Sequence, residues 1–350
     1  MARSSSPSLP ALLSLGGMLV AGACASACTS GGADPFPPLP ERPSIPEGKP
    51  PRRSPPKDPV GGFSIEVPKV HLKPGGEISP CYVFPLEVTG PSRLVGGGSL
   101  TVGPGMHHGN ITTRPKTGEG IRPCPPDDSG LAGEAIDIVK GGAVLFGSST
   151  QLTGTEWQSF PEGMAYRIRD GYEIVARMHY LNVTSETLEI APKYTWYTIA
   201  EEALTEELGP FAWNYNDIHI PPNTKMTDTG VCDLPAPMHI VNVLPHMHKL
   251  GTGFQARFLG GPLDGELFLD SPGYDPEKGV MEQYDPAVDL SQGDGMSFSC
   301  TWNNTLDKEI ELGIGDNEMC ILFGYAYPAE NAFTTVADEG HCVWVAPSTP

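Results

Sequence analysis

The chain has 350 residues, 42 glycines, 38 prolines and a formal net charge of −20. This length is sufficient for two medium-sized domains with their own cores. The acidity argues against a nucleic-acid partner, because phosphate binding needs a basic surface. The frequent glycine and proline favour short strands and turns over long helices.

Residues 1–28 have the features of an export signal. Arg3 supplies a positive start, and an apolar run from Leu9 to Ala23 follows, too short to remain as a membrane span. Cys24 and Cys28 each follow small residues, as at a bacterial lipoprotein site. Lipidation and simple cleavage both remain open. We therefore expect an exported protein that is periplasmic, an outer-membrane lipoprotein or extracellular, with membrane contact only through a lipid anchor.

The composition divides the rest of the chain into a tether and a folded part. Residues 29–61 are rich in proline and predict an extended, disordered linker. From Phe63 onward, short β-rich segments alternate with Gly, Pro, Asn and Asp, which is typical of antiparallel sheets. Residues 198–208 (TIAEEALTEEL) are the best helical candidate. We predict an all-β fold with two jelly-roll-like β-sandwich domains in tandem, at 62–198 and 199–350.

Six cysteines remain after the signal, and their even number in an exported chain predicts disulfides. Spacing alone leaves their pairing open, and the absence of a CxxC motif weakens a structural zinc site. The six are Cys81, Cys124, Cys232, Cys300, Cys320 and Cys342.

Several histidines are candidate metal ligands. His246 and His248 in LPHMHKLG lie on the same face of a strand, although such a pair is also common on a wet strand surface. His107 and His108 are adjacent and converge only if the backbone turns, and a lone His179 is ordinarily a structural residue. Imidazoles with a thioether suit copper, but the chain has 11 methionines. The residues alone therefore predict copper sites in a secreted β protein, without choosing the methionine.

The order of these segments resembles the type II copper, ascorbate-dependent monooxygenases, which include peptidylglycine α-hydroxylating and dopamine β-monooxygenases. The similarity runs from SPCYVFPL (79–86) to GHCVW (340–344). The segments that match the family are IPPNTK, PMHIVNV, GMHHGN, YEIVARMHYLN, HMHKLG and DNEMC. The last of these singles out Met319.

The resemblance implies two different copper sites facing each other across an interdomain cleft. His107, His108 and His179 would hold the electron-transfer copper, and His246, His248 and Met319 would hold the copper that activates O2. It also implies three disulfides: Cys81–Cys124, Cys232–Cys342 and Cys300–Cys320. The family hydroxylates a C–H bond with O2 and a reductant such as ascorbate. We accordingly expect a monomer that takes O2 and a small-molecule substrate.

The chain departs from the family in its substrate pocket. Where the peptide-hydroxylating member has Arg, Tyr and Asn, this chain has Leu244, Phe323 and Ile321, so a glycine-extended peptide is not expected. Arg177 replaces a family Gln and is interpreted either as a contact to an anionic substrate or, preferably, as an ion pair. Two alternatives to the enzyme remain: a copper-binding or electron-transfer protein without hydroxylase activity, and a structural β protein without metal.

Overall fold

The structure is a computed structural model that describes residues 43–126, 137, 141–147, 153–275, 281–293, 295–313, 317–335 and 342–345. The expected signal at 1–28 and the first part of the expected linker lie outside the described residues, as does His341. Arg42–Pro350 forms one compact unit. Apart from Asp137, which is helical, and short 3-10 turns, the regular structure of the described residues consists of strands, which confirms the all-β prediction.

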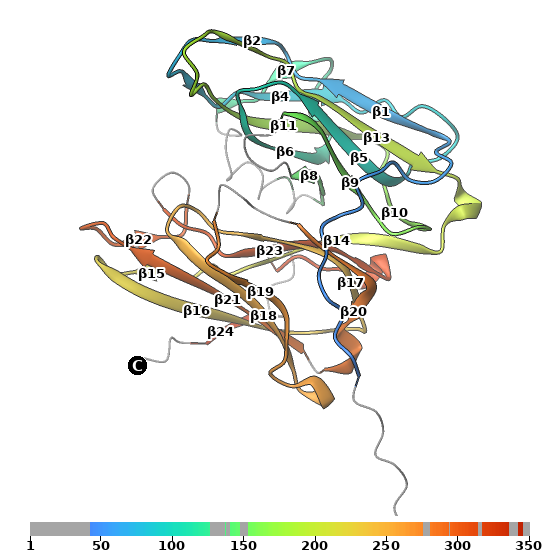
Figure 1. Cartoon of the computed structure of the whole chain (residues 1–350). Helices are drawn as coiled ribbons and strands as arrows, with labels where there is room; N and C mark the ends of the chain where they lie inside the picture. The colour runs from blue at the N-terminus through green and yellow to red at the C-terminus, as the bar shows by residue number, and fades with distance from the viewer. Residues whose placement is uncertain are drawn as a thin grey trace, which may run out of the picture. The chain divides into compact units, whose positions relative to one another are not determined.

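The largest sheet has nine strands and passes through both halves of the folded chain (Figure 1). Its order is β1 (Gly61–Glu66), β13 (Lys193–Ile199), β5 (Leu94–Val102), β10 (Met164–Arg167), β14 (Glu206–Asn214), β23 (Ile321–Tyr327), β17 (His239–His246) and β20 (Glu282–Asp289), with β9 (Gly154–Ser159) also paired to β5. Its neighbours are antiparallel except β10 and β14, which are parallel, with Met164 opposite Glu206.

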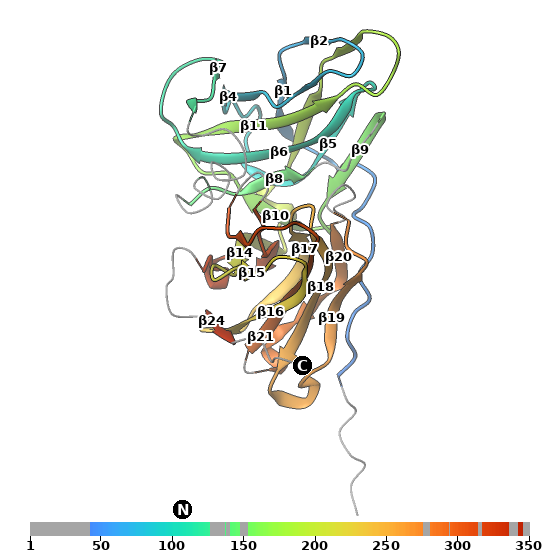
Figure 2. The same cartoon turned by 90° about the vertical axis from the view of Figure 1, so that its left-hand side faces the viewer.

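Two further sheets pack against this one in sandwich-like arrangements (Figures 1 and 2). The first contains β7 (Arg122–Pro123), β4 (Cys81–Pro85), β11 (Tyr172–Leu181), β6 (Met106–Pro115) and β8 (Val144–Gly147), with β3 (Glu77–Ile78) on β11. The second contains β19 (Leu267–Pro272), β18 (Gly251–Leu259), β21 (Gly295–Asn304), β16 (Thr224–Asp233) and β24 (Cys342–Val345). Two small pairs complete the strands: β2 (Val70–Leu72) with β12 (Leu188–Ile190), and β15 (His219–Ile220) with β22 (Ile310–Glu311).

Alternating side chains explain the sandwich layers. In β18, Phe254, Ala256 and Phe258 are buried, while Gln255 and Arg257 between them point away from the core. One hydrophobic core is formed by residues from Phe211 onward. A second core is formed mainly by residues 63–208 and takes in Val241 and Tyr325. The sandwich prediction is therefore confirmed, and the number of domains stays a prediction.

The helical candidate at 198–208 is wrong. It contains a single 3-10 turn, η2 (Glu201–Ala203), flanked by the end of β13 and the start of β14. Three further 3-10 turns are η3 (Gly261–Leu263), η5 (Leu290–Gln292) and η6 (Ala329–Asn331). Glu206–Leu208 pairs with β10 instead, because sheet pairing and burial of Leu208 outweigh the modest helix propensity of glutamate and alanine.

The described part of the expected linker is held against the fold. Lys49 and Gln283 exchange two backbone hydrogen bonds of 2.9 and 2.7 Å. The Ser159 hydroxyl donates to the Ser54 carbonyl at 2.6 Å. Backbone pairing with β20 and β9 thus fixes a stretch whose proline content allows it to run extended.

Three disulfides join the pairs that the family resemblance implies. Cys81–Cys124 closes β4 onto the segment after β7, and Cys232–Cys342 joins β16 to β24. Cys300–Cys320 connects β21 to the residue before β23, and so links two different sheets. Structural disulfides of this kind are typical of oxidising compartments. Across the described ranges, no helix is long and apolar enough to cross a bilayer.

Asp228 is a buried carboxyl on β16 with only 1% of its surface exposed. Its pKa is raised to about 6, mainly by burial; the hydrogen bond from Tyr215 opposes this rise, Asp217 adds to it and His219 opposes it. Because the folded pKa exceeds the unfolded value, the stability from the neutral carboxyl is fully present below pH ~4 and is lost as pH rises through ~6.

We expect Asp228→Asn to stabilise the protein at pH 7.5 by roughly 1–3 kcal/mol, with little gain at pH 4. Thermal unfolding at the two pH values measures the difference. Asp233→Asn on the same strand is the matched control, since Asp233 is exposed. An equal gain at both pH values would contradict the assignment of the effect to ionisation.

Candidate metal centres

Three histidines of the N-terminal half meet at the ends of β6 and β11. The ring centroids of His107, His108 and His179 lie 4.7–5.1 Å apart. One ligand nitrogen from each ring lies within 4.8 Å of the others. His179 is opposite His108, and a β-bulge follows at His179/Tyr180. The backbone irregularity needed for adjacent His107 and His108 to converge is present, with Gly105 at φ +98° just before them.

The imidazoles of this cluster are poised to offer lone pairs. Burial, followed by the charges of His179 and His107, lowers the pKa of His108 to about 4. His107 Nδ1 and His108 Nδ1 are 3.0 Å apart, so one ring must accept where the other donates. His179 Nε2 lies 2.7 Å from the Glu77 carboxylate, which leaves Nδ1 to face the other rings. A carboxylate on the far nitrogen is how proteins orient a metal-binding histidine.

Glu77 was missed by the sequence analysis. It lies on the two-residue strand β3, and only the β3–β11 pairing brings it near His179. No local motif around Glu77 signals this position.

Two histidines of the C-terminal half form a second buried cluster. His246 ends β17 and His248 follows the strand, with ring centroids 5.4 Å apart and nearly perpendicular planes. Burial, followed by the charges of His248 and His108, lowers the pKa of His246 to about 3.

The Nε2 atoms of His246 and His248 are both buried and have no hydrogen-bond partner among the described residues. His248 Nδ1 lies 2.7 Å from the Asn317 carbonyl, which can only accept. Nδ1 therefore carries the proton, and Nε2 offers a lone pair. Two buried ring nitrogens without hydrogen-bond partners are costly in an apolar interior, and they fit a soft or borderline metal ion such as copper.

Met319 lies beside this cluster on an apolar patch. The patch consists of Ala212, Met319, Ile321 and Phe323, with Val144 and Leu244 packed against it. The Phe323 ring is 6.0 Å from the His246 ring. The Cys300–Cys320 disulfide anchors the residue next to Met319. The patch that contains Met319 therefore lies next to His246 through Phe323.

Glu318 connects the histidines to the methionine segment. Its two carboxylate oxygens accept the backbone N–H groups of His248 and Leu250 at 2.8 and 2.7 Å. Burial raises the pKa of Glu318, and the backbone donors, including Met319 N–H, oppose the rise. Glu318 lies within the DNEMC motif, but nothing in its local sequence indicates this role.

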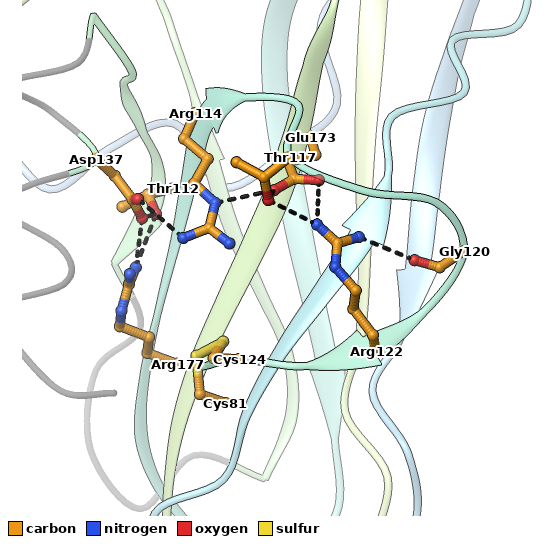
Figure 3. Close-up of polar contacts among 10 residues, drawn as sticks. All are labelled: Cys81, Thr112, Arg114, Thr117, Gly120, Arg122, Cys124, Asp137, Glu173 and Arg177. Atoms are coloured by element: carbon orange, nitrogen blue, oxygen red, sulfur yellow. Dashed lines mark hydrogen bonds and ion pairs between the residues drawn. A yellow bond between two sulfur atoms is a disulfide. The ribbon is translucent and has the colours of Figure 1, made fainter. Parts of the chain in front are cut away.

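Arg177 belongs to a buried network of charges on β6 and β11 (Figure 3). Its guanidinium donates to Asp137 at 2.7 Å and to the Thr112 hydroxyl at 3.0 Å. The network continues through Arg114 to Glu173, which also pairs with Arg122 at 2.6 Å. Arg177 is 7% exposed, so the ion-pair interpretation of this residue agrees with the structure.

The other described histidines have ordinary surroundings. His239 stacks on Tyr327 at 4.7 Å, and His71 lies 4.0 Å from Glu189. His219 groups with Glu309 and Glu311, and all three are exposed. Exposed acidic groups are usually solvated.

Comparison with known proteins agrees with this geometry. Residues 209–342 match the model of the copper type II ascorbate-dependent monooxygenase, C-terminal domain. This domain match supports the resemblance to the copper type II, ascorbate-dependent monooxygenase family seen in the motifs. The matched stretch contains His246, His248 and Met319.

Other comparisons add nothing to the identification. No curated protein gives a significant match. Among solved structures, a chain described as "Crystal structure of the T13 IBDV viral particle reveals a missing link in icosahedral viruses evolution" aligns with 9% identity over 85% of this chain and 81% of that chain, with a TM-score of 0.13. A similarity this weak carries no structural conclusion.

Proposed function

We propose that the protein is an exported monooxygenase that uses two coppers to hydroxylate a C–H bond of a small organic substrate. The observation that carries the proposal is the pair of buried Nε2 atoms of His246 and His248 that have no hydrogen-bond partner among the described residues. They lie next to the apolar patch that contains Met319, in a stretch matched by the model of a copper- and ascorbate-dependent family. The balanced reaction is R–H + O2 + 2e⁻ + 2H⁺ → R–OH + H2O, and a one-electron reductant such as ascorbate supplies the electrons.

The residues fall into two ligand sets of different character. His107, His108 and His179 would hold one copper through nitrogen alone, and His246, His248 and Met319 would hold the other through two nitrogens and a sulfur. Copper bound in these sets would store an electron at the first and reduce O2 at the second, since a thioether favours Cu(I).

The surrounding residues supply orientation and a dry environment. Glu77 fixes the ring of His179, and Asn317 fixes the tautomer of His248. Glu318 holds the backbone between His248 and Leu250. The apolar patch around Met319 excludes water from the position beside His246, which protects a reactive oxygen species from side reactions.

A copper-binding or electron-transfer protein without hydroxylase activity is the second candidate. The apolar pocket beside His246 favours the enzyme, because electron transfer or copper storage needs no such space. We further propose that the protein is a monomer located outside the cytoplasm, attached to a membrane only if Cys24 or Cys28 carries lipid.

Copper reconstitution tests the two-site proposal. We expect two coppers per chain, measured by elemental analysis after removal of loosely bound metal. His108→Ala and His246→Ala should each reduce the ratio by about one, because each removes a ligand from a different set. A ratio of one or less in the unmodified protein would refute the two-site proposal. O2 uptake that depends on both ascorbate and an added substrate separates the enzyme from a binding protein.

A further inference from the structure

An apolar pocket lies next to the second histidine cluster. Strands β8, β14, β17 and β23 contribute its walls, including Val144, Phe211, Leu244 and Phe323. Little of its space is enclosed, so only a compact molecule would fit.

The pocket and the histidines share one face of the sheet. Leu244 precedes His246 by two residues on β17, so both side chains point the same way. Leu244 is opposite Phe323 in the β17–β23 register, and the Phe323 ring lies 6.0 Å from the His246 ring. A molecule in the pocket would therefore lie beside the proposed O2-binding site.

Two glycines set the shape of the pocket. A Cβ on Gly324 would lie 2.2 Å from the Asn242 carbonyl oxygen and 2.4 Å from the Phe211 ring. A Cβ on Gly147 would lie 3.0 Å from the Leu244 side chain. Because these two positions carry no side chain, Phe211 packs closely on β23, and the end of β8 packs closely on Leu244.

Polar groups that line the pocket form hydrogen bonds within the protein. Asn242 Oδ1 accepts the Tyr325 backbone N–H at 2.9 Å. The Tyr325 hydroxyl donates to the Val144 carbonyl at 2.9 Å, and burial raises the pKa of Tyr325 well above its usual value. Among the described residues lining this pocket there is no Asp, Glu, Lys, Arg or His.

We propose that the substrate is a small, neutral and predominantly apolar molecule that binds in this pocket between β8 and β17. A charged group would lose its hydration without gaining an ionic partner, at a cost of several kcal/mol. An apolar ring gains binding free energy when its surface is removed from water. Hydroxylation of the bound molecule rests on the proposed monooxygenase function, whereas its binding to the pocket needs no metal.

Binding of three matched probes to the metal-free, full-length protein tests the proposal. Fluorine NMR follows 4-fluorotoluene, 4-fluorobenzylammonium and 4-fluorophenylacetate, which are neutral, cationic and anionic at pH 7. We expect the neutral probe to bind at least tenfold more tightly than either ion. Equal or tighter binding of an ion, or no binding of the neutral probe, would overturn the proposal.

Variants locate the binding to this pocket. Val144→Asp introduces a charge into its wall and should weaken 4-fluorotoluene binding at least tenfold. Val183→Asp makes the same change at a residue that is 73% exposed, and should leave binding unchanged. Leu244→Asn provides a second variant should Val144→Asp not fold, as judged by circular dichroism. Unchanged binding in a folded Val144→Asp or Leu244→Asn protein would contradict the assignment of the site.

The outcomes distinguish the substrate class from the enzymatic function. A protein that binds two coppers but not the neutral probe would keep the monooxygenase proposal and lose the substrate class. A protein that binds the probe but no copper would lose the function and keep the pocket.

Discussion

Replacement of Met319 by isoleucine is expected to reduce substrate-coupled O2 consumption by at least 100-fold. Isoleucine keeps the volume and the apolar contacts with Ile321 and Phe323 but removes the sulfur. In the proposed site, the reduced copper ion would lose a soft ligand and keep the two histidines. The measurement is O2 uptake with ascorbate and a substrate, together with elemental analysis of copper.

The three-histidine cluster provides the internal control for this variant. His107, His108 and His179 come from other strands, so their copper should remain bound and reducible by ascorbate in Met319→Ile. Met226→Ile, at a partly buried methionine on β16, is the matched control and should keep full turnover. Full turnover in Met319→Ile would remove Met319 from the proposed ligand set.

The second large effect is expected for Glu318→Ala. The variant leaves the backbone N–H groups of His248 and Leu250 without their carboxylate acceptor and creates a cavity. Such a loss costs roughly 3–5 kcal/mol. Thermal unfolding should show a decrease in Tm of at least ~5 °C in a chain of this size.

Glu318→Ala should also weaken copper binding at the second site alone. Without the carboxylate, His248 and Met319 lose their common anchor. The first site should keep its copper. Glu330→Gln, an exposed glutamate on η6, controls for the loss of charge. A Tm equal to that of the unmodified protein would contradict the structural role of Glu318.

The sequence predicted the layers of the fold because period-two patterns such as FQARF report burial directly. It failed at 198–208, where local propensity favoured a helix and the pairing of β14 with β10 imposed a strand. Pairing between distant strands depends on the whole chain, so no local pattern could reveal it. The same reason explains why the backbone bonds between Lys49 and Gln283 were not expected.

The candidate ligands could be identified from the sequence only because several motifs occur in the same order as in the family. An HMH triplet predicts a shared strand face, but it does not indicate burial or an unpaired Nε2. The supporting residues were harder to find. Glu77 and Asn317 act through a carboxylate oxygen and a main-chain carbonyl, and a carbonyl contact depends on backbone position alone. The ion pair of Arg177 could not be identified from the local sequence, because its partner Asp137 is 40 residues away in the chain.

The parallel pairing of β10 with β14 has a mechanical consequence for turnover. Hydrogen-bonded strands transmit force along their backbone, so a hinge that swung the histidine clusters apart would have to tear this ladder and the Lys49–Gln283 bonds. In the proposed two-copper cycle, the path of an electron between the two sites would then have a fixed length. Turnover should accordingly be insensitive to solvent viscosity, since no large-scale swing limits its rate.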